Sequence, residues 1–266
     1  AHNALRVTRT GGINEWKGIA SANAARNATY ACLLAQEGME GPKNLFEGQK
    51  GWKQIISGEF TVDLDPACSR VHDVMTKRYV AETYAQSAVE GIIELAEAED
   101  IDHGRVDIIH LDTFGGAALI IGGGEGDRYA VETKAQADHS LPYMLAAALI
   151  DREMGNEQYE AERIRADDVQ RLLRTVEVEE DSEFTERFEA GEMPARIEIT
   201  MTDGTTHVVE KNAFQGHPTQ PMDWGQVEAK FHTTASQFDE RRRTEIVETV
   251  RRLESTDVDD LVGLLA

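Results

Sequence analysis

Four short segments combine basic side chains with hydroxyl, amide and small side chains. The first runs over residues 16–27, the second over 77–87, the third over 137–143, and the fourth joins Gly216-His217-Pro218 to Lys230-Phe231. Basic groups bind anions, and imidazole or phenol groups transfer protons when a site positions them. No single segment identifies a function by itself, so the prediction also depends on the helices and strands that position these side chains.

Motifs for common cofactors are absent from the sequence. The run Gly122-Gly123-Gly124 is followed by neither a GKS/T nor a GxGxxG pattern, so we interpret it as a turn rather than a phosphate-binding loop. The eight histidines and two cysteines show no zinc-ligand spacing, and there is no GxSxG nucleophile elbow. We therefore predict neither a metal nor a cofactor.

The composition is strongly acidic. Among 266 residues, 49 are acidic and 27 basic, a formal net charge of −22, and the basic residues include only eight lysines. Such a charge disfavours nucleic-acid binding. A carboxylate-rich surface repels itself in dilute buffer, whereas molar salt shortens the Debye length to ~3 Å. We expect a folded protein of a halophile, with an ordinary acidic protein as the alternative.

The location expected for the protein is the cytoplasm. No apolar run approaches the ~20 residues of a membrane span, and the N-terminus does not resemble a signal peptide. Cys32 and Cys68 are too few for a disulfide framework, which fits a reducing compartment. Cys32, in an alanine-rich helical pattern, is predicted to be buried. Because residue 1 is Ala and a helical pattern follows soon after, we expect a fragment or a processed product.

The apolar periodicity predicts an α+β region between helical segments. Helices are expected over 15–40, 42–56, 82–98, 140–154, 166–174, 224–234 and 237–253. A β-branched run over 106–111 predicts a strand, and 194–210 predicts a hairpin that turns at Asp203-Gly204. The acidic stretch 177–192 is expected to be a surface loop with a short helix. We expect residues 1–70 in a helical domain, 71–213 in an α+β domain, and 214–266 to return as helices to the first.

The four segments, taken in order, resemble the MmgE/PrpD family, which includes 2-methylcitrate dehydratases. The matching motifs are W-K-G…N-A-A-R-N-A, K-R-Y…A-E…A-Q-S-A and D-H-S-L-P-Y, with G-M-x-G-P and F-E-G between the first two. The resemblance runs colinearly from about Asn3 to Phe231. It implies a helical domain joined to an α+β domain with the active site between them. Family chains are longer, so we expect most of the helical domain to be missing.

The resemblance also implies residue roles. Lys77, Tyr143 and Arg26 match active-site positions of related cis-aconitate decarboxylases, and His139 precedes Ser140, an expected N-cap. Alternatives are a surface position for Lys77 and Arg26, and a capping network with a packed ring for the 139–143 segment. Predicted catalytic residues are Lys77, Tyr143 and His139; predicted substrate-binding residues are Arg26, Lys17, Arg78, Glu82 and Gln86. Glu82 and Gln86 stand where the decarboxylases have histidines, which argues against decarboxylation.

The activity implied by the resemblance is elimination of water from 2-methylcitrate, or a close citrate-like tricarboxylate, in propionate catabolism. That reaction needs cations for the carboxylates, a base for the carbon-bound proton and an acid for the leaving hydroxyl. Alternatives are isomerisation or epimerisation of a small dicarboxylate such as iminodisuccinate, decarboxylation of cis-aconitate, and a non-catalytic dimerisation fragment. We expect a homodimer, and little activity from these 266 residues alone.

Overall fold

The structure, a computed structural model, describes residues 15–62 and 67–266 and divides into two units, Ala1–Val74 and Met75–Ala266. Helix and strand are both present, with helix in excess, which confirms the predicted α+β class. Among the described residues, no helix is long and apolar enough to cross a membrane.

The first unit is built around one long helix, α1 (Glu15–Gln36). It ends at Gln36, four residues before the expected end at residue 40, and Gly38 follows it with a φ of +88°, which suits glycine. The helix expected over 42–56 is wrong for most of its length. Only a short π-helix, Lys53–Ser57, and a 3-10 turn, Ser69–Asp73, follow among the described residues. Cys32 is exposed, so its predicted burial is wrong, because the described part of this unit does not cover that face of α1.

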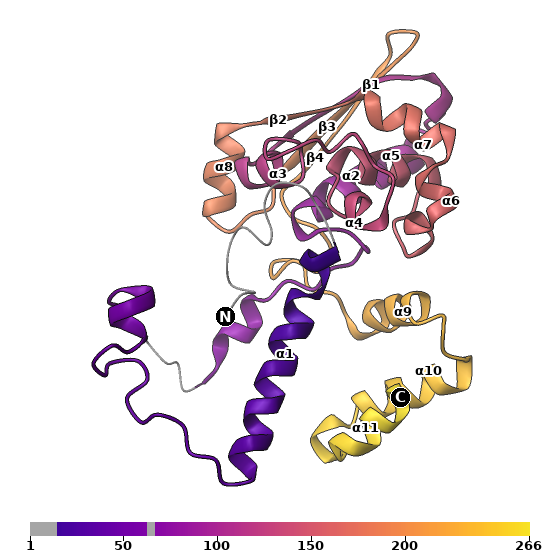
Figure 1. Cartoon of the computed structure of the whole chain (residues 1–266). Helices are drawn as coiled ribbons and strands as arrows, with labels where there is room; N and C mark the ends of the chain where they lie inside the picture. The colour runs from indigo at the N-terminus through magenta and orange to yellow at the C-terminus, as the bar shows by residue number, and fades with distance from the viewer. Residues whose placement is uncertain (1–14, 63–66) are drawn as a thin grey trace. The chain divides into compact units, whose positions relative to one another are not determined.

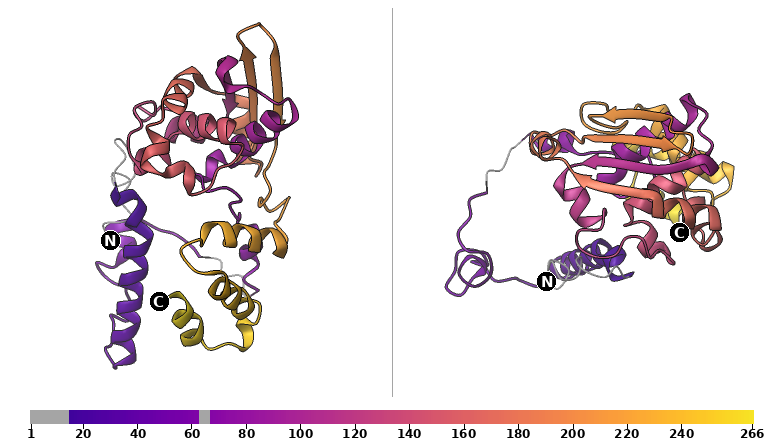
Figure 2. Two further views of the ribbon diagram at one scale, coloured as in Figure 1. Left: turned by 90° about the vertical axis from the view of Figure 1, so that its right-hand side faces the viewer. Right: turned by 90° about the horizontal axis from the view of Figure 1, so that it is seen from above.

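The second unit contains a four-stranded sheet in the order β2-β1-β3-β4 (Figures 1 and 2). Its strands are β1 (Val106–Thr113), β2 (Val176–Glu180), β3 (Ala195–Met201) and β4 (Thr206–Lys211). β1 pairs parallel with β2 and antiparallel with β3, and β3 forms with β4 the predicted hairpin. Gly204, in the turn, has a φ of +85°.

Helices cover one face of this sheet. The main ones are α2 (Gln86–Ala98), which contacts β3 and β4, and α5 (Leu141–Asp151), which contacts α2 and β2. Alternate residues of β3 are buried beneath them, so the period of two in the sequence marks the core face. The pairs Ile109–Ile199 and Leu111–Ile197 bring the inward side chains into register.

Shorter helices connect these elements and extend the unit. They are α3 (Gly115–Ile120), α4 (Lys134–Ala137), α6 (Ala161–Ile164), α7 (Asp167–Leu172) and α8 (Ser182–Glu189). The stretch 177–192, expected to be a loop with a short helix, begins with β2. Only Val176 and Val178 face inward along that strand, too few to signal it among glutamates.

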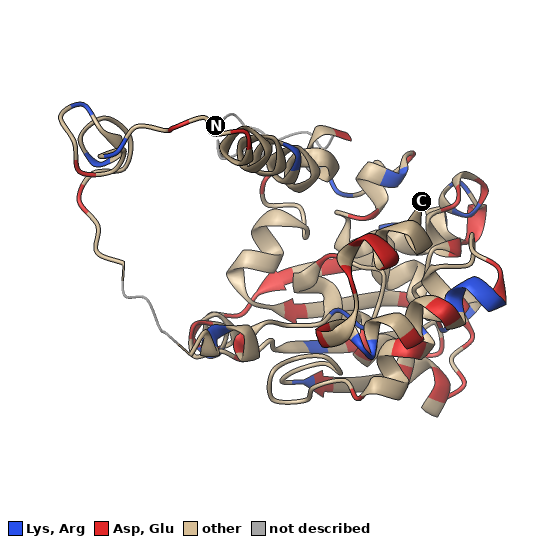
Figure 3. Ribbon diagram, turned by 90° about the horizontal axis from the view of Figure 1, so that it is seen from below, with Lys and Arg blue, Asp and Glu red and all other residues tan. Residues whose placement is uncertain are grey.

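Three helices follow the sheet: α9 (Trp224–Thr234), α10 (Glu240–Val250) and α11 (Val258–Leu265). All three belong to the second unit. That residues 214–266 return to a helical domain stays a prediction. Acidic residues are spread over helices, strands and loops of the second unit (Figure 3), where they outnumber the basic residues.

Candidate active site

The segment that carries Lys77 and Arg78 is held by backbone hydrogen bonds at several points. The Thr76 amide donates to the carbonyl of Gly216 at 2.8 Å, and the Val80 amide donates to the carbonyl of Met154 at 3.0 Å. Gly216 must be glycine here, because its φ is +113° and a Cβ would meet the carbonyl of Thr76. The segment is therefore fixed between two loops that come from distant parts of the chain.

Gln86, at the start of α2, fixes the same segment from inside. Its side chain is completely buried. The amide oxygen accepts from the Tyr79 amide at 3.1 Å, and the amide nitrogen donates to the carbonyls of Tyr79 and Ala81 at 3.2 Å each. Glu82 caps the short turn before α2 by accepting from the Tyr84 amide at 2.6 Å. These two side chains therefore hold the backbone, and neither lines the cavity that the segment faces.

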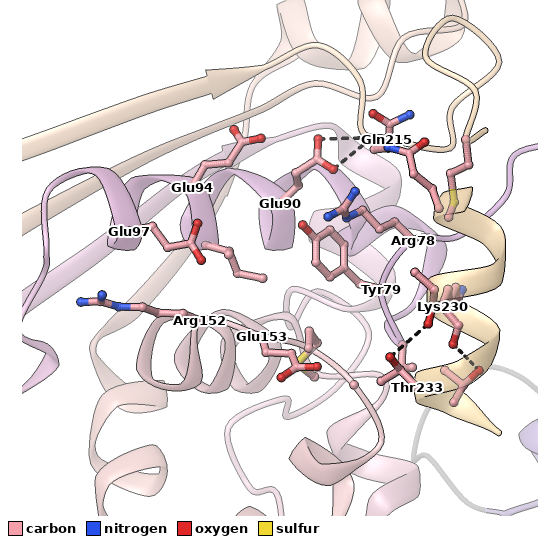
Figure 4. Close-up of a pocket in the computed structure, with 18 of the residues that line it drawn as sticks. Arg78, Tyr79, Glu90, Glu94, Glu97, Arg152, Glu153, Gln215, Lys230 and Thr233 are labelled. Carbon is pink, nitrogen blue, oxygen red and sulfur yellow. Dashed lines mark hydrogen bonds between the residues drawn. The ribbon is translucent and has the colours of Figure 1, made fainter. Parts of the chain in front are cut away.

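A cavity of about 540 Å³ lies beside this segment (Figure 4). Its walls come from residues 78–80, one side of α2, the turn after α5, the end of β4 with the loop that follows, and α9. The charged residues lining it are Arg78, Glu90, Glu94, Glu97, Arg152, Glu153, Lys211 and Lys230. Positive and negative groups are equal in number, so the arrangement of their contacts decides what the cavity can bind.

Two of the four cations are paired with carboxylates. The Lys211 ammonium lies 3.0 Å from the buried Glu90 carboxylate and 2.8 Å from that of Glu94. Burial alone would lower the pKa of Lys211, but hydrogen bonds and charge from the two glutamates outweigh it and raise that pKa. Arg152 donates to Asp100 at 2.6 Å. Both cations are therefore already neutralised within the fold.

The other two cations have no such partner. Among the described residues, no carboxylate oxygen lies within 4.0 Å of the side-chain nitrogens of Arg78 or Lys230, and the same is true of the exposed Lys77. The Lys230 ammonium instead donates a hydrogen bond to the backbone carbonyl of Lys77. Lys77 and Lys230 thus lie together where α9 meets the 77–80 segment. The Arg78 guanidinium extends from the same segment toward Tyr79 and α2 (Figure 4).

The electrostatics of this end differ from those of the Lys211 end. Burial, and then the positive charge of Lys77, lower the pKa of Lys230. Burial and the charge of Glu90 raise the pKa of Tyr79 to about 12, so its phenol stays protonated at neutral pH. Arg78 lies over the Tyr79 ring, 5.6 Å from its centroid. This end of the cavity therefore offers cationic groups and an uncharged phenol to a ligand.

The third sequence segment lies outside the cavity. Ser140 caps α5 as expected, accepting from the Tyr143 amide at 3.1 Å. Tyr143 is completely buried, and its hydroxyl donates to the carbonyl of Gln158. The Nδ1 atom of His139 contacts the Asp138 carboxylate and lies 3.2 Å from the carbonyl oxygen of Ala135. This arrangement is the capping network with a packed ring that the sequence left open as the alternative.

The remaining predicted residues belong to the first unit. Arg26 is exposed on α1, and its guanidinium donates to Asn27 at 3.4 Å. Lys17 falls in the same helix, but its side chain lies outside the described residues. Of the predicted residues, Arg78 lines the cavity and Lys77 precedes it on the same segment. The roles of Arg26 and Lys17 stay predictions.

No role for Lys230, Lys211 or Glu90 is predicted from the sequence. Lys230 stands out there only as part of the fourth segment. The scarcity of lysine is the only feature of the sequence that draws attention to Lys230, since the chain has eight lysines among 266 residues. Lys211 and Glu90 gave no signal, since their pairing joins residues 121 positions apart.

One group of side chains elsewhere has the geometry of a cation site. His110, Asp112 and Glu179 lie on the sheet face opposite α2 and α5, with ligand atoms within 4.8 Å of one another. Arg196 donates to Asp112 at 3.2 Å and to Glu198 at 3.0 Å. Because this arginine already supplies a positive charge to Asp112, we assign the group no ligand.

Comparison with known proteins agrees with the motifs. Residues 79–254 match the MmgE/PrpD C-terminal domain, and residues 1–65 match the MmgE/PrpD N-terminal domain. Cis-aconitate decarboxylase from Mus musculus is 24% identical over 247 residues, which cover 88% of this chain and 49% of that protein. The chain therefore spans about half the length of this curated relative.

Proposed function

The chain belongs to the MmgE/PrpD family, and from this premise we propose that the protein containing it is a lyase for small di- or tricarboxylates. The reaction we favour is removal of water from 2-methylcitrate to give 2-methylaconitate. The observation that carries the proposal is a set of three basic side chains that have no carboxylate partner among the described residues. Arg78 and Lys230 line the cavity, and Lys77 lies beside Lys230 on the segment that carries Arg78.

This grouping is informative because of the charge on the rest of the chain. With 49 acidic residues available, a cation can readily find a carboxylate, as Lys211 and Arg152 do. Cations that stand together repel one another, and a bound polyanion relieves that repulsion. An arginine can hold one carboxylate with two parallel hydrogen bonds, while lysines act as point charges for others. The cavity thus suits a ligand with more than one carboxylate.

The proposed roles follow from the positions of the side chains. Lys77 and Arg78 bind carboxylates, and Gln86 and Glu82 keep the backbone of their segment in place. Arg26 and Lys17 are proposed to bind substrate from the first unit, a role that rests on the family resemblance. His139 and Tyr143 keep their proposed catalytic role on the same basis. For Tyr143 the buried hydroxyl supports a positioning role better.

Alternative activities use the same cations. The relative at 24% identity is a decarboxylase, so decarboxylation of cis-aconitate is the second candidate. Isomerisation or epimerisation of a dicarboxylate such as iminodisuccinate uses the same proton abstraction without loss of water. A non-catalytic dimerisation fragment is a third alternative, and the basic side chains without carboxylate partners among the described residues argue against it. Assembly as a homodimer, action without a cofactor, a cytoplasmic location and a halophilic source remain parts of the proposal.

The test is an assay of the full-length protein in molar KCl against 2-methylcitrate, citrate, cis-aconitate and iminodisuccinate. We expect an unsaturated product from 2-methylcitrate and no carbon dioxide. Release of carbon dioxide from cis-aconitate would favour the decarboxylase, and inversion without loss of water would favour the epimerase. If none of the acids reacts or binds, the proposed function is wrong.

A further inference from the structure

Two lysines line the same cavity in opposite circumstances. Lys211 is held between Glu90 and Glu94, and its pKa is raised. Lys230 has no carboxylate within 4.0 Å among the described residues, and its pKa is lowered. One lysine is thus fixed as a cation by the fold, whereas the other can lose its proton more easily.

The surroundings of Lys230 explain this difference. The side chain is half-buried on α9, which removes water from the charged form. Its nitrogen donates to the carbonyl oxygen of Lys77, a bond that a neutral amine can make as well as an ammonium. The positive charge of Lys77 disfavours a second charge nearby. The other charged groups that line the cavity are Arg78, Glu90, Glu94, Glu97, Arg152, Glu153 and Lys211. Among the cations of this set, Lys211 is paired with Glu90 and Glu94, and Arg152 is paired with Asp100.

Proton transfer from carbon needs a base with these properties. A lysine becomes a useful base when burial and a cationic neighbour favour its neutral form. Substrate carboxylates bound by Lys77, and by Arg78 further along the cavity, would lie near this amine, because Lys230 is bonded to the backbone of Lys77 and lines the same cavity as Arg78. The carbon beside those carboxylates would then face a group able to take its proton.

We propose that Lys230 is the residue that accepts the carbon-bound proton of the substrate. This inference rests on the proposed function and adds a catalytic group to it. In the step, the carbon–hydrogen bond breaks and a nitrogen–hydrogen bond forms on Lys230. The electron pair becomes the new carbon–carbon double bond as the carbon–oxygen bond breaks and hydroxide leaves. The hydroxide and the proton on Lys230 together make the water that is released.

The first test measures the amine itself and needs no turnover. The lysines of the full-length protein are labelled in competition with acetic anhydride at a series of pH values, and each is quantified by mass spectrometry. We expect Lys230 to become reactive at lower pH than Lys211, and Lys77→Met to shift the Lys230 profile to higher pH. A Lys230 profile at or above that of Lys211 would overturn the proposal, whether or not the enzyme turns out to be a dehydratase.

The second test separates a proton acceptor from a cation that only binds. Lys230→Arg keeps the positive charge but cannot act as a base near neutral pH. We expect Lys230→Arg to lower kcat by ~100-fold or more, the scale of a general base, with KM nearly unchanged. Melting temperatures check that the variants fold. Activity of Lys230→Arg within a few-fold of the original would make Lys230 a carboxylate-binding residue only, which contradicts the proposal.

A third experiment tests Lys230 as the proton acceptor even if the enzyme does not remove water from its substrate. The substrate is incubated with the enzyme in D₂O, and exchange of its carbon-bound hydrogen is followed by NMR. If the enzyme is an isomerase and not a dehydratase, exchange should persist in the original protein and be lost in Lys230→Arg. Exchange that continues unchanged in Lys230→Arg would show that another group takes the proton.

Discussion

The Lys230 side chain donates a hydrogen bond to the backbone carbonyl of Lys77, across 153 positions of the sequence. The contact joins α9 to the segment that Gln86 holds from inside the second unit. It therefore holds α9, with Lys230 in the cavity wall, against the segment that carries Lys77 and Arg78.

The exposed Lys77 should matter for activity and little for stability. In the full-length protein, Lys77→Ala should lower the elimination rate by ~100-fold or more, the effect of losing one charge-stabilising group. The melting temperature should change little, because the side chain is exposed. Lys77→Arg is the matched control and should keep part of the activity. Full activity of Lys77→Ala would show that Lys77 is a surface residue with no role in catalysis.

Gln86 should matter first for stability. Gln86→Leu removes three hydrogen bonds to the backbone of Tyr79 and Ala81, and the free energy of unfolding should fall by roughly 1–3 kcal/mol. Ser87→Ala is the control on the same helix, since the buried Ser87 hydroxyl has no partner among the described residues and its loss should be nearly neutral. Urea unfolding of both variants checks this. Equal stability of the two would mean that Gln86 does not hold the segment.

The two cavity lysines should differ in their effect on folding. Lys211→Met leaves Glu90 buried without its cation, and it should cost roughly 2–3 kcal/mol, below the figure for a fully buried pair. Lys230→Met should lower the free energy of unfolding far less, because it leaves no buried carboxylate without its cation. Adding Glu90→Gln to Lys211→Met should recover part of the loss in a double-mutant cycle. A larger loss for Lys230→Met than for Lys211→Met would reverse the roles assigned to these residues.

Tyr143 offers a pH-dependent test. Burial raises the pKa of its phenol in the folded protein. Below pH ~10 the phenol is protonated in both states, so its contribution to stability is complete. Above that pH the unfolded chain ionises first, and stability is lost as pH rises. Tyr143→Phe should remove this alkaline loss at a cost of about 1 kcal/mol at neutral pH for the missing hydrogen bond.

Activity of the same variant decides the role of Tyr143. A positioning residue predicts that Tyr143→Phe keeps activity within about tenfold, whereas loss of a general acid or base predicts 100-fold or more. Urea unfolding at pH 8 and pH 11, with the rate measured at neutral pH, gives both readouts. A large loss of rate without loss of stability would favour the catalytic role.

Salt should stabilise the fold. With a net charge of −22 the melting temperature should fall as KCl is lowered from molar concentration to ~0.1 M, where the Debye length grows to ~10 Å. Potassium sulfate at matched ionic strength controls for effects specific to chloride. A melting temperature that stays constant over this range would contradict halophilic adaptation.

The sequence by itself determined the family, the α+β class and most of the helices and strands. The reason is local: apolar periods mark α2, α5 and the β3–β4 hairpin, and Ser140 and Gly38 mark helix ends within a few residues of chain. It also identified Lys77 and Arg78 as members of one basic segment. Local signals failed at β2, where two valines lie among glutamates, and at 42–56.

Only the tertiary structure decided what individual side chains face. Gln86 and Tyr143 turn inward and bind backbone, although both lie in segments that suggested substrate contact. Lys211 and Lys230 look alike in sequence, but one meets two glutamates and the other meets a lysine. The charge state and access of a side chain depend on groups packed around it from distant parts of the chain, and no spacing within a segment records them.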